Sequence, residues 1–380
     1  MTPTNNESYT DRTKEESNVP NFAMQFDQST RTFSRHEFTE PQLRPGEILV
    51  QVTCCTICGS DLHTFTGRRS GPESCVLGHE IIGEIAAWNA QTAPLDFHGN
   101  ELRVGQRVTW AMAVGCGSCF YCQRQLNQKC ESLFKYGHES ADENYPTGGL
   151  SHHCVIVPGT PIFPINDKLA DEVACPANCA TATVMAATRL AQQSHPLQGS
   201  TVMIMGAGML GLTAAAQLSE VGAAVIAMAD VAPDRLELAR DFGATHTICS
   251  DVPEKIEEFI RSHSNNRGAD VALDFAGPTS TVSTCIQSVR TGGCVVLVGS
   301  VYPTDDLSIS PESIVRRMLT IRGVHNYLPQ DLGNALQFLE RTRDRFPFAE
   351  LVTDSFRLEQ TTQAFDYALN ERPVRVAIRD

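Results

Sequence analysis

A glycine-rich turn constrains the fold of this chain more than any other feature of its sequence. The turn is Gly206-Ala-Gly208-Met209-Leu210-Gly211, and it lies between the apolar residues 201–205 and an alanine-rich stretch. The first glycine permits a tight turn, the second lets a pyrophosphate approach the backbone, and the third lets the following helix pack closely, with its N-terminus facing the anion. Strand, turn and helix in this order predict a βαβ unit that binds a dinucleotide.

The 380 residues are enough for two domains, and their patterns change along the chain. We expect residues 1–21 to be a flexible tail and residues 22–183, with short strands between turns, to form a mainly-β domain. Residues 184–326 alternate strand and helix patterns, which predicts a doubly wound parallel sheet with helices on both faces. Residues 327–380 hold one helix pattern (331–339) and a final strand (374–378), and we expect this segment to return to the first domain.

The composition excludes several classes of partner. The chain has 44 Asp and Glu against 30 Lys and Arg, a net charge of −14, which disfavours nucleic acid and anionic membranes. The uncharged stretch 201–218 contains turn glycines and is better divided into strand, turn and helix than assigned to a membrane span. Residues 1–21 lack the apolar stretch of a secretory signal. Several of the 14 cysteines lie at metal-ligand spacings, so we expect a reducing compartment and a cytoplasmic protein.

Four cysteines within a lobe of about residues 115–131 have the spacing of a metal site: Cys116, Cys119, Cys122 and Cys130. Two-residue gaps let neighbouring sulfurs point at a common centre, so four thiolates can surround one tetrahedral Zn²⁺. No coordination position then remains for water, which predicts a structural zinc. An iron–sulfur cluster is the runner-up, disfavoured because the sequence has no second cysteine cluster.

A second set of ligand-type residues is dispersed along the chain: Cys58, His79 and Cys179. Two thiolates and one imidazole would leave the fourth position of a tetrahedral zinc open to water or substrate, which is the arrangement of a catalytic site. Asp61 is the candidate carboxylate that accepts the other ring N–H of His79. Taken alone, however, single Cys and His residues are most often simply buried.

Asp230 follows Gly206 by 24 residues, at the end of the next predicted strand. A carboxylate at this position can accept hydrogen bonds from the ribose hydroxyls of NAD and would repel the 2′-phosphate of NADP, so NAD is favoured. Arg235 opposes this preference, because a nearby cation could accommodate that phosphate.

The four-cysteine lobe, the dispersed ligand-type residues and the glycine-rich turn together resemble the zinc-dependent alcohol dehydrogenases of the medium-chain dehydrogenase/reductase superfamily. The resemblance implies an α/β fold in which a Rossmann domain is inserted into a GroES-like catalytic domain, with the active site in the cleft between them. It implies one catalytic zinc on Cys58, His79 and Cys179 and one structural zinc on the four-cysteine lobe. It further implies that Ser60 contacts the substrate oxygen, that His63 ends a proton relay, and that Asp61 and Glu80 are acidic residues beside the metal.

Five strings carry a narrower resemblance, to a subgroup described as phosphonate-catabolism-associated alcohol dehydrogenases: Gly67-Arg-Arg69, 135–139, 206–212, 298–303 and 316–327. A phosphonate would need local cations in so acidic a protein, and Arg68 and Arg69 follow the zinc-site loop closely enough to reach the cleft. A solvent-facing arginine pair is the competing interpretation. By the family resemblance, His325, Asn326 and Tyr327 border the nicotinamide and substrate, and copies of the chain associate as a dimer or tetramer.

The sequence therefore predicts reversible oxidation of a small alcohol to an aldehyde or ketone, with hydride transfer to NAD and the substrate oxygen polarised by zinc. A polyol or sugar dehydrogenase of the same fold is the first alternative; such enzymes often have Glu as the third zinc ligand, where this chain has Cys179. The second alternative is a non-catalytic protein that binds NAD and zinc.

Overall fold

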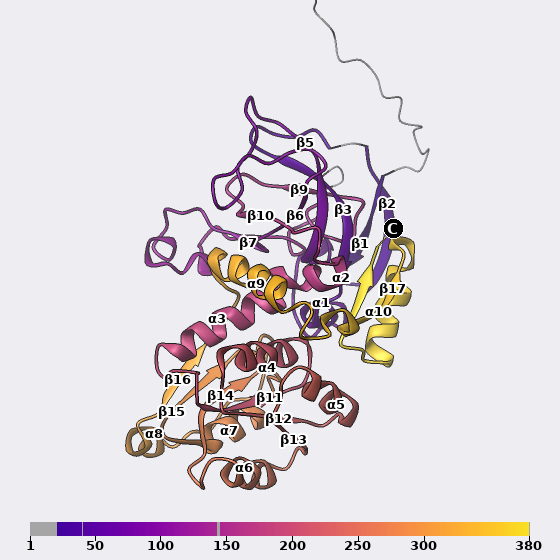
Figure 1. Ribbon diagram of the computed structural model, residues 1–380. Coiled ribbons are helices and arrows are strands. Elements are labelled where there is room, and N and C mark those ends of the chain that lie inside the picture. The colour runs from indigo at the N-terminus through magenta and orange to yellow at the C-terminus, as the bar shows by residue number, and fades with distance from the viewer. Residues whose placement is uncertain (1–20, 40, 143–144, 380) are drawn as a thin grey trace, which may run out of the picture.

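Two groups of strands occupy opposite ends of the molecule, and helices lie between and around them (Figure 1). The structure is a computed structural model that describes residues 21–39, 41–142 and 145–379, so the predicted tail lies outside the described residues except for Asn21. One group of strands comes from the first half of the chain together with the C-terminal segment. The other group comes from the residues between them.

The second group is a parallel sheet that follows the glycine-rich turn. In the described chain it has six strands, in the order β13-β12-β11-β14-β15-β16, and every neighbouring pair is parallel. The strands are β11 (Thr201–Met205), β12 (Val225–Asp230), β13 (His246–Cys249), β14 (Ala269–Asp274), β15 (Val289–Leu297) and β16 (Thr320–Gly323). The chain order reverses between β11 and β14, where doubly wound sheets bind their ligands.

Helices cover both faces of this sheet because side chains alternate along each strand. Val202 and Ile204 of β11 pack in one core with α3, α4, α5 and α9, whereas Met203 and Met205 pack in another with α6 and α7. The helices are α3 (Ala180–Gln192), α4 (Met209–Val221), α5 (Pro233–Asp241), α6 (Pro253–Ser262), α7 (Thr279–Ser288), α8 (Pro311–Arg317) and α9 (Pro329–Thr342). The stretch 201–218 thus divides into β11 and α4, and in the described part of the chain no helix is long and apolar enough to cross a membrane.

The first group of strands is mainly antiparallel and surrounds two further cores. Its largest sheet has the order β10-β6-β5-β3-β18-β17, with β9 beside β3, and two smaller sheets pair β2-β1-β4 and β7-β8. The strands are β1 (Phe22–Asp27), β2 (Thr32–Glu37), β3 (Ile48–Thr56), β4 (Ser74–Val76), β5 (Glu80–Trp88), β6 (Arg107–Trp110), β7 (Ala113–Val114), β8 (Phe134–Lys135), β9 (His153–Ile156), β10 (Ile162–Pro164), β17 (Val352–Phe356) and β18 (Arg375–Ile378). Two short helices, α1 (Gly59–Phe65) and α2 (Asp171–Ala174), join them.

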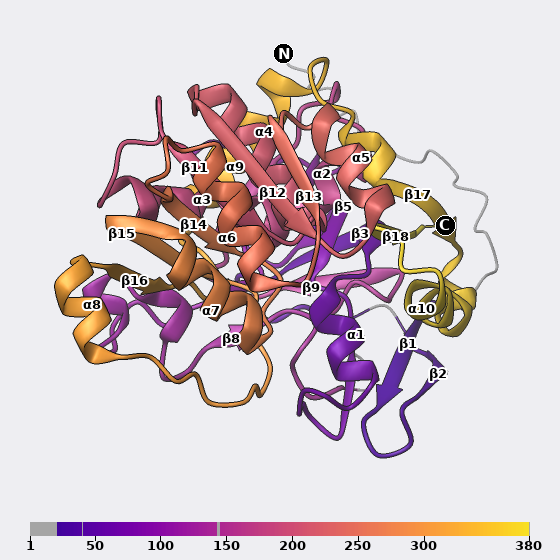
Figure 2. The same ribbon diagram turned by 90° about the horizontal axis from the view of Figure 1, so that it is seen from below.

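The C-terminal segment returns to the first group of strands, as Figures 1 and 2 show. Strand β18 pairs antiparallel with β3, with Ala377 opposite Thr56 and Ile378 opposite Cys55. The prediction of one helix in this segment was incomplete, because α10 (Thr361–Asn370) follows α9. The predicted fold class, a Rossmann-type parallel sheet combined with a mainly-β domain, is confirmed. Helix α3 runs continuously through the expected division at residues 183 and 184.

Candidate metal and cofactor site

Cys58, His79 and Cys179 come together although they are far apart in the sequence. Cys58 is the N-cap of α1, His79 directly precedes β5, and Cys179 precedes α3. Their ligand atoms all lie within 4.8 Å of one another, and the sulfurs of Cys58 and Cys179 are 3.8 Å apart. Two sulfurs that each lie about 2.3 Å from a tetrahedral Zn²⁺ are about 3.8 Å apart, so the donor set and its spacing fit zinc.

Helix α1 arranges the groups around these ligands. The Asp61 carboxylate accepts the Cys58 backbone N–H at 2.9 Å through Oδ2, and its Oδ1 lies 3.1 Å from Nδ1 of His79. This contact turns Nε2 of His79 towards the two sulfurs, and the Ser60 hydroxyl lies 3.3 Å from Nε2. His63, one helical turn after Ser60, lies on the same face of α1. Asp61 and Ser60 therefore lie against the two different ring nitrogens of His79.

The Cys58 sulfur has the environment of a thiolate. The Cys179 thiol donates a hydrogen bond that lowers the pKa of Cys58 well below its ordinary value, against the opposing effect of burial and with support from the charge of Arg375. Arg375, on β18, donates to the Cys58 sulfur at 3.5 Å and to Glu80 Oε1 at 2.8 Å. Glu80 is fully buried and also accepts a hydrogen bond from the Thr56 hydroxyl, so it acts on the metal ligands through Arg375.

Asn178 connects several segments behind the metal ligands. Its side-chain amide donates to the carbonyl oxygens of His79 at 3.0 Å and Trp110 at 3.1 Å. The backbone carbonyl of Asn178 accepts a hydrogen bond from the hydroxyl of Tyr327. The same hydroxyl accepts a hydrogen bond from the backbone N–H of Met112 at 3.1 Å. The prediction that Tyr327 borders the substrate needs correction, because this side chain is buried behind the cavity wall by its two backbone partners and does not line the cavity.

The glycine-rich turn has the geometry of a phosphate cradle. Gly206 has φ +99°, and a Cβ on Gly211 would lie 1.8 Å from the Gly206 carbonyl oxygen, so α4 approaches β11 as only glycine allows. A Cβ on Gly208 would meet only the Arg235 guanidinium, at 4.0 Å, so the backbone there faces open space at the α4 N-terminus. The turn thus fits a dinucleotide pyrophosphate.

Asp230 and Arg235 lie beside this turn and have different partners. The Asp230 carboxylate accepts the backbone N–H of Ala207 at 2.6 Å and of Ala232 at 2.9 Å. Arg235 lines the cavity and donates to the carbonyl of Arg372 at 2.7 Å. Asp230 therefore fixes the turn through both carboxylate oxygens, and the described cation nearest Gly208 is Arg235.

One cavity of about 650 Å³ joins the three metal ligands to the glycine-rich turn. It is bordered by both groups of strands, which places it in the cleft that the sequence predicts. Many of the predicted site residues line it: Cys58, Ser60, His63, Arg68, Arg69, His79, Cys179, Gly208, Met209, Leu210, Gly211, Arg235, His325 and Asn326. The predicted residues Gly206, Asp230 and Glu80 are not part of its lining, and the four lobe cysteines lie elsewhere. Lys135 also lines the cavity, although no motif of the sequence marks it as a site residue apart from its place at the start of the string 135–139.

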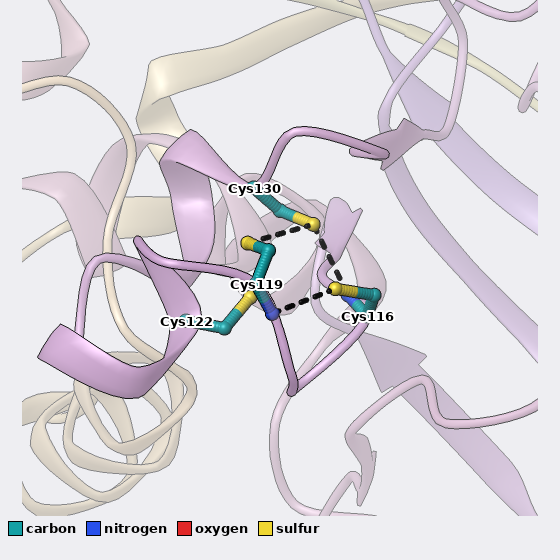
Figure 3. A group of neighbouring side chains, drawn as sticks. All are labelled: Cys116, Cys119, Cys122 and Cys130. Carbon is teal, nitrogen blue, oxygen red and sulfur yellow. Dashed lines mark hydrogen bonds between the residues drawn. The ribbon is translucent and has the colours of Figure 1, made fainter.

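The four predicted cysteines of the lobe converge on a second centre, as Figure 3 shows. Their sulfurs all lie within 4.8 Å of one another, and those of Cys119 and Cys130 are 3.8 Å apart. Backbone N–H groups point at the sulfurs, including that of Cys119 at Cys116 (3.3 Å) and that of Cys116 at Cys130 (3.2 Å). Donation from Ser118 and from backbone N–H groups lowers the pKa of Cys116 to about 6. Four thiolates in this geometry fit a tetrahedral zinc with no open position.

Comparisons with known proteins agree with this geometry. Residues 44–167 match the alcohol dehydrogenase GroES-like domain and residues 210–341 match the zinc-binding dehydrogenase family. Sorbitol dehydrogenase of Bacillus subtilis is 31% identical over 345 residues, covering 90% of this chain and 92% of the relative.

Two solved structures have the same architecture. An alcohol dehydrogenase from Thermotoga maritima, 25% identical, superimposes with a TM-score of 0.88 over 95% of this chain and 99% of its own. Alcohol dehydrogenase TADH from Thermus sp. ATN1, 27% identical, has a TM-score of 0.82 over 94% of this chain and 99% of its own. By sequence and by fold, the chain belongs to the zinc-binding alcohol dehydrogenases of the medium-chain dehydrogenase/reductase family.

Proposed function

We propose that this protein catalyses the reversible oxidation of a small polar alcohol by NAD, with a catalytic zinc on Cys58, His79 and Cys179 and a structural zinc on the four-cysteine lobe. The observation that carries the proposal is the single cavity that contains both the three convergent ligands and the glycine-rich turn. A non-catalytic protein would not need an incomplete ligand set beside a dinucleotide cradle. The oxidation removes a hydride from the alcohol carbon and a proton from its hydroxyl.

The residues of the chain divide this work between binding and proton transfer. When bound, zinc supplies Lewis acidity and the nicotinamide accepts a hydride. Ser60 Oγ, beside the ligand nitrogen of His79, accepts the substrate hydroxyl proton while its own proton leaves through water to His63, which lies on the same face of α1 and releases a proton to solvent. The backbone of the turn and Arg235 hold the cofactor phosphates at the other end of the cavity.

We favour NAD over NADP because of the Asp230 carboxylate. It lies at the end of β12 beside the turn, where a 2′-phosphate would meet its negative charge. Initial rates with each cofactor measure this preference directly.

A polyol dehydrogenase is the second candidate function, and the similarity to a relative named sorbitol dehydrogenase favours it. The two candidates share the zinc site and the cofactor and differ only in the substrate. The cysteine at position 179 favours the first candidate, because the resemblance associates polyol enzymes with a Glu ligand. The phosphonate-bearing substrate suggested by the narrower resemblance is a proposal about the same cavity.

A substrate panel followed by NADH absorbance tests the proposed function. We expect the protein to reduce NAD with at least one class among simple alcohols, polyols and hydroxyalkylphosphonates. Cys58→Ala and Cys179→Ala should each abolish turnover and lower the zinc content from two ions to one per chain, while the circular dichroism spectrum stays close to that of the parent. Cys249→Ala, which changes an exposed cysteine outside both centres, is the control and should keep both zinc ions.

Two results would contradict the proposed function. One is robust NAD reduction by Cys58→Ala with no zinc at the site. The other is no reaction across the whole panel with either cofactor, which would favour a binding protein.

A further inference from the structure

Three cations line the metal end of the cavity and lack acidic partners. Arg68 and Arg69 follow α1, and Lys135 is the last residue of β8. In the described part of the chain, none of the three forms an ion pair. Asn326 lines the same cavity, and its amide nitrogen is buried with no hydrogen-bond partner among the described residues. In a protein with a net charge of −14, an uncompensated basic group of this kind calls for a reason.

The acidic groups of the site are already neutralised by other partners. Asp61 contacts His79 and the Cys58 backbone, and Glu80 pairs with Arg375. A divalent zinc would offset the charges of the Cys58 and Cys179 thiolates. The positive charges of Arg69 and Lys135 then remain without a counterion in the structure.

The surroundings of Lys135 disfavour its charged form, mainly because the side chain is buried. Burial, followed by the charge of Arg69, lowers the pKa of Lys135 to about 8, even though the cysteines of the zinc site and Asp61 act in the opposite direction. A bound anion would restore a normal environment to the ammonium group. An anionic ligand beside Lys135 would therefore stabilise the charged form of its ammonium group.

The cofactor does not account for these cations. The residues that would hold its phosphates, the backbone of the turn and Arg235, lie at the opposite end of the cavity. Lys135 instead lies close enough to Cys58 and Cys179 for their charges to raise its pKa. An alcohol bound at the proposed catalytic zinc would therefore lie at the same end of the cavity as Lys135.

We propose that Arg69 and Lys135, with Arg68 at the rim and the Asn326 amide, form an oxyanion subsite that binds a negatively charged group on the substrate, so that the preferred substrate is a short alcohol carrying a phosphonate or phosphate. This inference rests on the proposed function and specifies its substrate class. Two or three cations around one ligand group favour a dianion over a carboxylate, and arginine grips such a group through paired hydrogen bonds.

The experiment compares three alcohols of equal chain length: a hydroxyalkylphosphonate, a hydroxyalkanoate and a neutral alkanediol. We expect kcat/KM to be highest for the phosphonate and to fall with added salt. Arg69→Gln and Lys135→Gln should each lower kcat/KM for the phosphonate by about ten-fold or more, since each removes a charged hydrogen bond, and change the value for the diol by less than about three-fold. Arg31→Gln is the matched control, because Arg31 lies against Gly67 in the same region but does not line the cavity.

A binding measurement separates this inference from the proposed function. Calorimetric titration of the zinc- and NAD-loaded protein with methylphosphonate, which has no hydroxyl to oxidise, should show saturable binding that Arg69→Gln and Lys135→Gln weaken and Arg31→Gln does not. Turnover of the diol together with equal kcat/KM values for the charged and neutral alcohols would overturn the subsite and leave the dehydrogenase intact. Absence of methylphosphonate binding would overturn it as well, whatever the panel shows. A preference for the hydroxyalkanoate would contradict the dianion.

Discussion

A single carboxylate orients two of the three proposed zinc ligands. Asp61 accepts the backbone N–H of the ligand Cys58 with one oxygen and contacts the ring of the ligand His79 with the other. The first contact caps α1, and the second fixes which ring nitrogen faces the metal. The same residue therefore starts the helix that carries Ser60 and His63 and sets the imidazole against which Ser60 lies.

Asn178→Ala should weaken zinc binding although Asn178 is not a ligand. The substitution leaves the carbonyls of His79 and Trp110 without their donor in a buried site, at a cost of about 1–3 kcal/mol each. We expect the zinc affinity of the catalytic site to fall by about 10- to 100-fold, as measured by competition with a chelator. Asn89→Ala removes a comparable side-chain donor to the Leu43 carbonyl on the exposed surface and should leave the affinity unchanged. Equal affinities in the two variants would refute a positioning role.

His63 should determine the acidic limb of the pH profile. Burial, followed by the charge of Arg68, lowers the pKa of His63 below its ordinary value of 6.5, so the ring stays neutral and able to accept a proton further into the acidic range. With a neutral diol as substrate, kcat/KM should fall only below this value. Arg68→Gln should raise the pKa of His63 and shift the limb to higher pH, and His63→Gln should remove the limb. A limb that does not move in either variant would exclude His63 from the relay.

Sequence reasoning found the residues that bear a chemical signature and missed those that act through contacts. Cysteines at ligand spacings and a glycine-rich turn are local motifs that can be recognised in the sequence. Asn178 and Arg375 act through partners separated by up to 317 residues, which no local pattern contains. The charge of Arg375 in an otherwise apolar strand is the one available signal, because a buried arginine requires a carboxylate partner.

At the scale of elements, the four-cysteine lobe shows how little regular structure a metal site needs. In the described residues between β7 and β8 the helical structure is limited to two short 3₁₀ turns, at Cys122–Arg124 and Asn127–Lys129, and the large side chains Phe120 and Leu126 are exposed. A lobe with so few buried apolar groups needs another source of stability, which a bound zinc supplies.

Cys119→Ser should therefore destabilise the protein more than it impairs the chemistry. We expect loss of one zinc per chain and a fall of the apparent Tm by about 5 °C or more, measured by calorimetry. Lys129 in this lobe lies 2.8 Å from the His325 ring at the cavity wall, so KM should rise while kcat at low temperature stays within about three-fold. An unchanged Tm with both zinc ions retained would contradict the structural role. Cys285→Ala, in the core of the parallel sheet, controls for the loss of a buried thiol outside the lobe.

The limits of element prediction follow from burial. Strand β11 was predicted with its observed bounds, because four of its five residues are buried and a glycine turn ends it. Strand β13 and helix α10 were missed. The residues of β13 are partly exposed and mixed in polarity, as expected for the edge of a sheet. The apolar residues of α10 pack on the N-terminal strands. This contact joins residues far apart in the sequence, so the local sequence of α10 does not predict it.

At the scale of the whole molecule, residues from both ends of the described chain form the candidate metal site. The C-terminal strand β18 inserts beside β3 and places Arg375 against Cys58 and Glu80, so the last residues of the chain complete the environment of a ligand near its start. The cavity between the two groups of strands then joins metal ligands from one group to the nucleotide turn of the other. Catalysis by either part alone is not expected.

A parallel sheet with an open edge offers a surface for a second copy. Strand β16 pairs only with β15 in the described chain, and nearby Val315 and Met318 are 73% and 74% exposed. We propose that copies of the protein associate along this edge. Met318→Asp should lower the sedimentation coefficient by shifting a dimer to monomers, whereas Met318→Leu should not. A monomeric parent protein would contradict the proposal.

In the proposed function, Cys58, His79 and Cys179 hold one zinc with a free coordination position facing a bound dinucleotide. Anomalous diffraction at the zinc edge from crystals grown with NAD tests it most directly. We expect one anomalous peak among these three side chains, a second among the four cysteines, and the nicotinamide beside the first. A first site without zinc, or a zinc whose fourth position is permanently filled by a protein side chain away from the nicotinamide, would rule out this catalytic site.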